Sequence, residues 1–221
     1  MSRNIEFTPG EFFHVYNRGT EKRNIFMQQT DYERFQALLY IANSNLAIRF
    51  EDIKRQGSTL LDFYTLERER TFVDIYAYVL MPNHFHILIK QKHQNGISQF
   101  MHKLSTAYTM YFNIRNERTG ALFQGRYKAK HVDEDRYLKY LISYIHLNPI
   151  KLIEPSWKET RIQDKSAAKD YLNTYTYSSY LDFIGQIRPE NAILPHEYSP
   201  SYFAELRSFE YEVIDWLSYR D

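Results

Sequence analysis

Two histidines one residue apart are the side chains best placed to do chemistry. His84 and His86 lie in residues 84–90, an apolar and aromatic segment that predicts a β-strand. Because side chains alternate between the faces of a strand, both imidazoles should project from one side and Phe85 from the other. Two neighbouring imidazole nitrogens can bind a divalent metal ion. The H-x-H spacing alone leaves open the alternative of a histidine pair satisfied within the core.

A row of tyrosines is the second candidate. A helix is predicted over residues 137–147. Three- and four-residue steps place on one face of it Tyr137, Tyr140, Tyr144 and, directly after its end, Asn148. If this face meets the histidines, the phenol of Tyr144 could attack a phosphodiester and Asn148 could add an oxygen ligand to the metal. Tyr140, one turn away, is a rival nucleophile. The alternative, common for aromatic stripes on helices, is that the tyrosines pack against a neighbouring element.

A basic stretch, residues 115–130, is the third candidate. Its five cations oppose one carboxylate, Glu117, and aromatic residues lie between them. Single-strand binding needs cations for phosphates beside rings for bases, although basic loops are common on soluble proteins. With one residue from the loop after the first predicted strand, the candidate DNA-binding set is Arg18, Arg115, Arg118, Gln124, Arg126, Tyr127, Lys128 and Lys130.

Three predicted strands would position the histidines. Residues 73–80 and 84–90 are apolar segments on either side of the turn Met81-Pro82-Asn83, which predicts a hairpin. Residues 12–16 are aromatic and β-branched, which favours a further strand. The H-x-H pair therefore lies in the returning strand of a hairpin, directly after its turn.

Helical periodicity predicts the elements around these strands. One helix begins at Thr30, where Thr30 and Glu33 fit a capping box, and continues irregularly toward Gly57. The tyrosine helix starts after the carboxylates of residues 133–135 and stops at Asn148, because Pro149 forces its predecessor out of the helical region. Residues 171–183 form either a strand or an irregular packed segment. Two more helices are expected over residues 98–116 and 200–219.

The composition narrows the chemistry. With 221 residues and 43% hydrophobic content, the chain can bury one substantial core. It has no cysteine, which excludes disulfides, thiolate metal sites and cysteine nucleophiles. A net charge of +1 gives no overall basic signal, so nucleic-acid binding must rest on local patches. We find no apolar stretch of membrane-spanning length and no signal-peptide pattern, so a cytoplasmic protein is expected.

Four stretches, in this order along the chain, carry a family resemblance: residues 13–19, 78–86, 120–128 and 144–150. Together they resemble the HUH tyrosine transposases, and most closely the REP-associated tyrosine transposase branch. A proline-asparagine turn that leads directly into H-x-H is seldom found with the other three stretches by chance. The resemblance covers the chain from about residue 10 to 155.

The resemblance implies an α+β fold with a ferredoxin-like core. A central antiparallel sheet would hold the H-x-H strand in its middle, with helices packed on one face and the tyrosine helix over the metal. Residues 1–155 would form the transposase domain, and residues 156–221 a C-terminal extension packed on that core. The resemblance also implies His84, His86 and Asn148 as ligands of Mg²⁺ or Mn²⁺, and Tyr144 as the nucleophile.

The same resemblance implies a substrate and a product. The substrate would be single-stranded DNA with a hairpin beside the cleavage point, either REP-like or an insertion-sequence end. Attack by Tyr144 would give a covalent 5′-phosphotyrosine and a free 3′-hydroxyl, which a later strand transfer consumes. Related enzymes act as monomers or as homodimers, so both states are open.

Two other functions fit these residues. A metal-dependent phosphodiesterase that uses water would keep His84 and His86 without needing Tyr144. A non-catalytic nucleic-acid-binding protein would keep only the fold, although the presence of all three residues argues against such decay.

Overall fold

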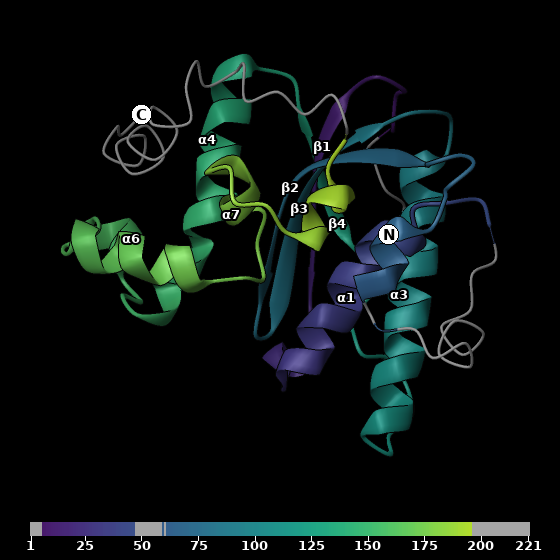
Figure 1. Ribbon diagram of the computed structural model, residues 1–221, viewed down its shortest axis with the longest axis horizontal. Helices are drawn as coiled ribbons and strands as arrows, with labels where there is room; N and C mark the ends of the chain where they lie inside the picture. Colours follow the sequence, from purple (N-terminus) through teal and green to yellow (C-terminus); the bar gives the residue numbers. More distant parts are fainter. Residues whose placement is uncertain (1–5, 47–58, 60, 196–221) are drawn as a thin grey trace.

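Four antiparallel strands form the centre of the computed structural model, which describes residues 6–46, 59 and 61–195 (Figure 1). Their order in the sheet is β2-β3-β1-β4, so β3, the H-x-H strand, is an inner strand as expected. The strands predicted at residues 12–16, 73–80 and 84–90 are confirmed. The bounds are Phe12–Arg18 for β1, Val73–Met81 for β2, His84–Gln91 for β3 and Lys128–Val132 for β4.

Strand β4 overlaps the end of the basic stretch and was not predicted. Its sequence KAKHV alternates exposed lysines with half-buried residues. Lysine is depleted in strands in general, so this segment does not look like a strand in the sequence. Lysine is nevertheless common on edge strands, where it discourages pairing with another chain. Because β4 is an edge strand, its lysines follow from its place in the sheet.

Helices cover both faces of the sheet (Figure 1). On one face α1 (Gln29–Ile41) and α3 (Gly96–Arg115) pack against Phe13, Phe85 and other buried side chains of β1 and β3. On the other face α4 (Asp135–Leu147) packs against Val79 and Leu88. The predicted α+β fold with a central antiparallel sheet is confirmed. Packing of helices on one face holds for α1 and α3, whereas α4 covers the opposite face.

The opposite placement of α4 has a physical cause. Side chains of an inner strand alternate, so the sheet presents a second apolar surface that water would otherwise contact. The apolar stripe of α4, which includes Leu138, Leu141 and Ile145, buries that surface. Each such side chain contributes about 1.5–3 kcal/mol when it leaves water. Two cores therefore lie back to back across one sheet.

Helix starts and stops agree with the sequence to within a few residues. Helix α3 confirms the prediction over residues 98–116. Helix α1 is capped by Gln28 and Asp31, and not by Thr30 and Glu33, because the Asp31 carboxylate accepts hydrogen bonds from the backbone N–H groups of Met27 (2.8 Å) and Gln28 (3.1 Å). It ends at Ile41. The predicted extension toward residue 57 falls mostly outside the described residues.

Helix α4 ends at Leu147 as predicted, and the chain then tightens into the 3₁₀-helix η3 (Asn148–Leu152). Proline is tolerated there because the first residues of a helical turn need no N–H donor. The helix predicted over residues 200–219 lies outside the described residues. None of the described helices has the length and apolar character that a membrane span requires.

Residues after η3 form short helices that pack beside α4. Residues 171–183 contain the end of one helix, an irregular segment and the whole of the next short helix, with an isolated bridge from Ser178 to Val79. Trp157, Leu172 and Tyr180 share the apolar cluster of α4. The division near residue 155 stays a prediction. The helices are α5 (Trp157–Thr160), α6 (Lys165–Thr174), α7 (Tyr180–Phe183) and η4 (Pro189–Ile193), while η1 (Thr20–Lys22) and η2 (Leu61–Thr65) lie earlier in the chain.

Candidate active site

The register of the sheet brings the sequence candidates into rows on one face. In the pairing of β1 with β3, Tyr16 lies opposite His86 and Arg18 lies opposite His84. In the pairing of β1 with β4, Tyr16 lies opposite Lys128. Directly paired residues of antiparallel strands project from the same face. This is the face that α4 covers, so the histidines and the tyrosine helix meet.

Three imidazoles gather on this face, and we call His14, His84 and His86 the imidazole cluster. Nε2 of His14 lies 2.9 Å from Nδ1 of His86, within hydrogen-bond distance. The ring centroids are 5.0 Å apart for His14 and His86, and 5.1 Å apart for His84 and His86. The two histidines of β3 thus share one side of the strand, as the alternation predicts, and β1 supplies the third.

Tyr144 of α4 lies directly against this cluster in the same chain. Its ring centroid is 5.4 Å from that of His86 and 6.4 Å from that of His14, both in edge-to-face geometry. The rival nucleophile Tyr140 lies one turn back, with its ring centroid 6.3 Å from that of Tyr144. Of these two phenols, Tyr144 is the one whose ring contacts the imidazoles. Its role as nucleophile stays a prediction.

Asn148 closes the site from the end of α4. It is 2% exposed, and its side chain is hydrogen-bonded to His84. Its Nδ2 also lies 3.4 Å from the backbone oxygen of Tyr144. One helical turn therefore delivers the phenol to His86 and the amide to His84, because residues four apart share a helix face.

Burial keeps the imidazole cluster neutral. It lowers the pKa of His14 and of His84 to about 4, and holds the pKa of His86 well below its ordinary value. Nearby positive charges add to the effect: Lys130 acts on His14, and Lys158 acts on His84 and His86. At neutral pH the rings therefore carry the lone pairs that a metal ligand needs.

The donor set fits a divalent metal. Nδ1 of His84 lies 2.6 Å from Oδ1 of Asn83, and Nδ1 of His86 pairs with His14, so each ring has an orienting partner on one nitrogen. Such partners on the second ring nitrogen are typical of metal-ligating histidines. Within the part of the chain that the structure describes, no group of three His, Asp or Glu side chains has an arrangement that could hold a metal ion by itself. A third ligand from this set would be the amide oxygen of Asn148.

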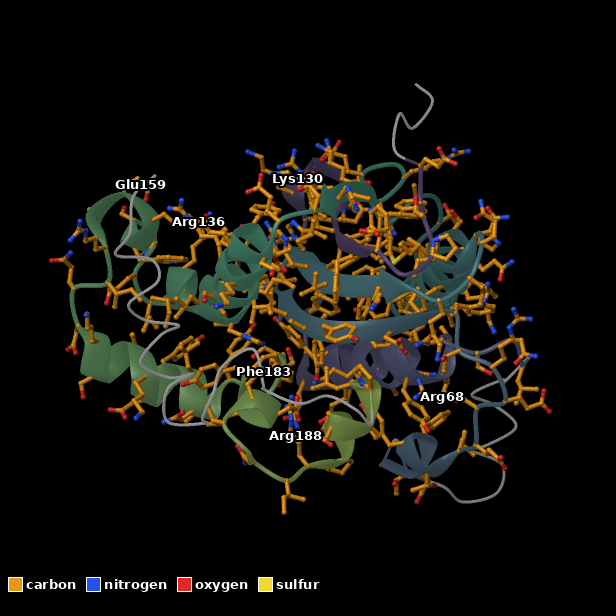
Figure 2. The ribbon with its side chains drawn as sticks, turned by 90° about the horizontal axis from the view of Figure 1, so that it is seen from above. Arg68, Lys130, Arg136, Glu159, Phe183 and Arg188 are labelled. Carbon is orange, nitrogen blue, oxygen red and sulfur yellow. The ribbon has the colours of Figure 1, made fainter. Side chains whose placement is uncertain are left out.

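Cations surround the cluster. Arg18, Lys151 and Lys158 act on His84, each lowering its pKa after the larger effect of burial. The Nζ atom of Lys158 lies 4.0 Å from the ring centroid of Tyr144. At the β4 edge, Lys130 contributes a further positive charge, and Figure 2 shows it at the sheet edge opposite to Arg188. The site can therefore attract a polyanionic strand although the whole chain is close to neutral.

The predicted DNA-binding residues divide into groups. Arg18, Lys128 and Lys130 lie on the face of the imidazole cluster. Gln124 accepts a hydrogen bond from Nε of Arg18 and so lies beside them. These four residues can contribute to one surface with the candidate nucleophile.

The remaining predicted residues lie elsewhere. Arg126 and Tyr127 line a cavity of about 320 Å³ next to α3. Arg115 donates to Thr30 and Gln28 and forms an ion pair with Asp31, and so ties the end of α3 to the start of α1. Arg118 donates to the Asn113 side chain in the last turn of α3 and to the backbone oxygen of Ala121 in the loop that follows. The structure does not bring these four residues to the imidazole cluster, and their DNA contacts stay predictions.

Sequence reasoning missed three residues of the site. His14 lies on β1, and strand alternation with Tyr16 and Arg18 could have placed it on the face of His86 once the pairing was known. Lys151 and Lys158 come from η3 and α5, and their isolated positions carried no sequence signal. Their approach to the histidines depends on how the chain folds back after α4.

Comparison with known proteins shows the family of the chain. The family model described as IS200-like transposase matches residues 13–148, which include β1, the hairpin, β4 and α4. No curated protein matches the chain. Among solved structures, one similar chain is described as a REP-associated tyrosine transposase bound to a REP hairpin. It is 12% identical, and the alignment covers 90% of this chain and 93% of that chain with a TM-score of 0.49. Because the family model spans more than half of the sequence, the protein belongs to the IS200-like transposase family.

Proposed function

We propose that this transposase cleaves single-stranded DNA beside a hairpin and holds the cut strand as a covalent 5′-phosphotyrosine on Tyr144. The observation that carries the proposal is the contact between the Tyr144 ring and the imidazole cluster within one chain. The membership of the transposase family supports the same reaction class. Because nucleophile and candidate ligands come from a single chain, we propose that a monomer suffices for cleavage.

The proposed metal site uses His84, His86 and Asn148. A bound Mg²⁺ or Mn²⁺ would polarise the scissile phosphate and offset the negative charge on its oxygens. His14 and Asn83 orient the two ligand rings through their Nδ1 atoms. The low pKa of His84 and His86 keeps both rings deprotonated at neutral pH. These side chains therefore need no prior proton loss to bind a cation.

The covalent step is a displacement at phosphorus. The phenol of Tyr144 loses its proton as its oxygen forms a bond to phosphorus, the bond to the 3′-oxygen breaks, and that oxygen takes up a proton and leaves as a hydroxyl, so no net proton is gained or lost. Lys158 beside the Tyr144 ring places positive charge next to the developing phenolate. Attack by another DNA 3′-hydroxyl on the phosphotyrosine reverses the step and joins the strands. The phosphotyrosine preserves the bond energy, so strand transfer needs no nucleotide cofactor.

Labelled, hairpin-bearing oligonucleotides incubated with the protein and Mn²⁺, then separated on denaturing gels, test the proposal. We expect protein-linked DNA with the native chain and with Tyr140→Phe, and none with Tyr144→Phe. An adduct that survives Tyr144→Phe but not Tyr140→Phe would move the nucleophile by one turn. Cleavage without any adduct would indicate water as the nucleophile. Binding without cleavage across a broad oligonucleotide pool would indicate a non-catalytic protein.

A further inference from the structure

Three tyrosine rings form a ladder along one face of α4, ending at the candidate nucleophile. The ring centroids of Tyr137 and Tyr140 are 6.2 Å apart with an interplanar angle of 22°. Those of Tyr140 and Tyr144 are 6.3 Å apart with an interplanar angle of 12°. We call Tyr137, Tyr140 and Tyr144 the tyrosine ladder. Its rings are nearly parallel, so they present similarly oriented faces along the helix.

The ladder is held in place, and its middle ring is partly exposed to solvent. Tyr137 and Tyr144 are half-buried and pack against the apolar cluster beneath α4. Tyr140, the middle ring, is 39% exposed. A stripe that served only to fill the core would bury its central ring, as the same helix does with Leu141. The arrangement instead keeps an aromatic surface in contact with solvent and fixes its orientation.

Both ends of the ladder carry an ammonium group. Nζ of Lys130, from β4, lies 4.0 Å from the ring centroid of Tyr137. Nζ of Lys158, from α5, lies 4.0 Å from the ring centroid of Tyr144. These two cations come from different elements, yet they meet the same row of rings. Carboxylates at residues 133–135 flank the start of α4, so a polyanion could follow the ladder only as far as Tyr137.

We propose that the tyrosine ladder is a base-stacking track for the single strand next to the scissile phosphate, with Lys130 and Lys158 binding its backbone. Aromatic rings bind bases regardless of sequence, and cations neutralise the phosphates between them. The track rests on the proposed function, because it leads the strand to Tyr144. It adds a binding site for unpaired nucleotides that is separate from any contact with a hairpin.

Two oligonucleotide probes separate stacking from charge. One is fluorescein-labelled oligothymidylate of about ten nucleotides, a span that single-strand binding sites commonly cover. The other has the same number of phosphates and abasic sugars throughout. Binding is measured by fluorescence anisotropy in EDTA with Tyr144→Phe, which keeps the ring and prevents an adduct. We expect oligothymidylate to bind at least about fivefold more tightly than the abasic probe, which is the lower end of the contribution of one stacked base.

Substitutions at the middle of the ladder give the decisive comparison. In the Tyr144→Phe background, Tyr140→Leu should remove most of the preference for bases and leave abasic binding unaltered, whereas Tyr140→Trp should restore the preference. Lys130→Gln should weaken both probes alike. Tyr171→Leu, on α6, is the matched control and should keep the preference. An unaltered preference in Tyr140→Leu, or no preference before the substitution, would overturn the track.

Failure of the track and failure of the proposed function are distinguishable. A base preference that depends on Tyr140, together with no adduct from the native chain in Mn²⁺, would leave the track in place and remove the covalent mechanism. A normal adduct, with no base preference, would remove the track alone.

Discussion

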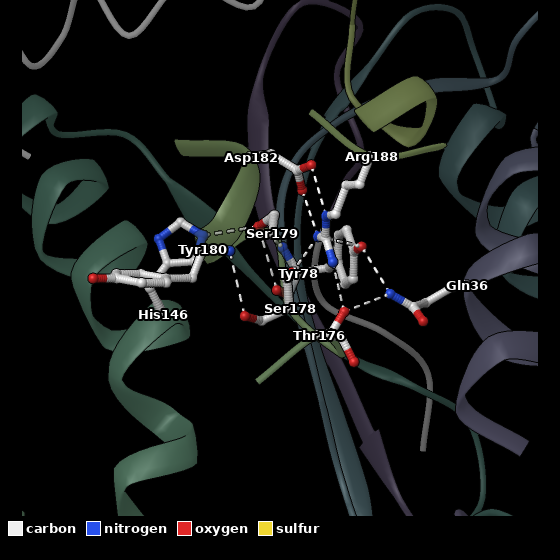
Figure 3. A network of polar contacts seen from close by, with 9 residues as sticks. All are labelled: Gln36, Tyr78, His146, Thr176, Ser178, Ser179, Tyr180, Asp182 and Arg188. Carbon is white, nitrogen blue, oxygen red and sulfur yellow. Dashed lines mark hydrogen bonds and ion pairs between the residues drawn. The ribbon is translucent and has the colours of Figure 1, made fainter. Parts of the chain in front are cut away.

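Helix α4 has a polar cluster on each side, and the two are built from different chemistry. On one side lies the imidazole cluster beside Tyr144. On the other, Arg188 forms a two-point ion pair with Asp182, with Nε–Oδ1 and Nη2–Oδ2 distances of 2.9 and 2.6 Å. Figure 3 shows this second cluster running from α4 past β2 to α1. We call it the Arg188 network, and its members are Gln36, Tyr78, His146, Ser179, Asp182 and Arg188.

Most polar groups of the Arg188 network bond to one another within the protein. Arg188 and Gln36 both bond to the hydroxyl of Tyr78, at 3.2 and 3.1 Å. His146 shares a hydrogen bond of 2.8 Å with Ser179, whose Oγ also accepts from the backbone N–H of Tyr78. Since α4 carries His146, the network fixes that helix against β2. Tyr144 and Asn148, two residues to either side, are thereby held over the histidines.

The imidazole cluster instead consists of neutral rings surrounded by cations. His14, His84 and His86 bond to each other or to amide groups, and Lys130, Lys151, Lys158 and Arg18 lower their pKa values after burial has done so. The surplus of positive charge suits an anionic strand, whereas the neutral imidazoles offer the lone pairs that a metal needs. One cluster therefore stabilises α4, whereas the other is suited to bind and react. Four substitutions or conditions test this contrast.

Breaking the buried ion pair should have the largest effect. Arg188→Met leaves Asp182 charged and buried, which should cost about 3–5 kcal/mol of unfolding free energy. Urea denaturation followed by circular dichroism measures the change. The double variant with Asp182→Leu is the control and should recover much of the loss, because an apolar pair avoids the desolvation cost. A loss below about 1 kcal/mol in the single variant would mean that the network contributes no more than a surface ion pair.

Removing a candidate ligand should affect activity and not stability. His84→Ala should lower the rate of adduct formation by roughly a hundredfold or more, because a bound metal supplies several kcal/mol of transition-state stabilisation. It should also remove the rise in melting temperature that Mn²⁺ gives the native chain. The unfolding free energy without metal should change by only about 1 kcal/mol. A Mn²⁺-induced rise of native size in the variant would exclude His84 as a ligand.

His14 should have an intermediate effect, because it acts through His86. His14→Ala removes the partner of His86 Nδ1 and should weaken Mn²⁺ binding and adduct formation by about 10- to 100-fold. His14→Asn can still offer a hydrogen bond and should recover part of the loss. Calorimetric titration with Mn²⁺ gives the affinity directly. Full Mn²⁺ affinity in His14→Ala would show that His86 is oriented without it.

The pH dependence of stability should show the most gradual effect, because it accumulates over several pH units. Burial, with help from the charge of Arg188, lowers the pKa of His146 from 6.5 to about 3. The unfolded chain therefore takes up a proton below pH 6.5 that the folded chain refuses, and the unfolding free energy falls as the pH falls toward 3. Each such histidine contributes a slope of about 1.4 kcal/mol per pH unit in this window.

His146→Gln tests that slope. Glutamine keeps a donor near Ser179 and does not titrate. The slope of the unfolding free energy against pH, measured between pH 6 and 4, should therefore be smaller than for the native chain by the contribution of one histidine. Most of the slope that remains in the variant should come from His14 and His84, whose pKa values are about 4 in the folded chain. An unaltered slope in the variant would mean that His146 is protonated in the folded chain.

The local sequence pattern was sufficient to predict many of the elements of this protein and the faces on which their side chains lie. Alternation on β3 places His84 and His86 on one face whatever the rest of the fold, and the helical period does the same for Tyr144 and Asn148. The apolar segments around the Pro82 turn predict the hairpin. These features depend on residues close in sequence, so the local pattern determines them. Strand β4 was not predicted, because its lysines are explained by its position at the edge of the sheet, and that position depends on how all four strands pair.

Other features depend on contacts between distant residues. His14 and His86 are 72 positions apart, and only the register of β1 against β3 makes them neighbours. The ends of α3 and α4 both carry basic or aromatic residues that the sequence offers as DNA-binding or catalytic candidates. The two helices nevertheless lie on opposite faces of the sheet. The sequence thus determined which side chains share a strand or helix face. The tertiary structure decided which of those faces meet, because side-chain burial and strand register act across the whole fold.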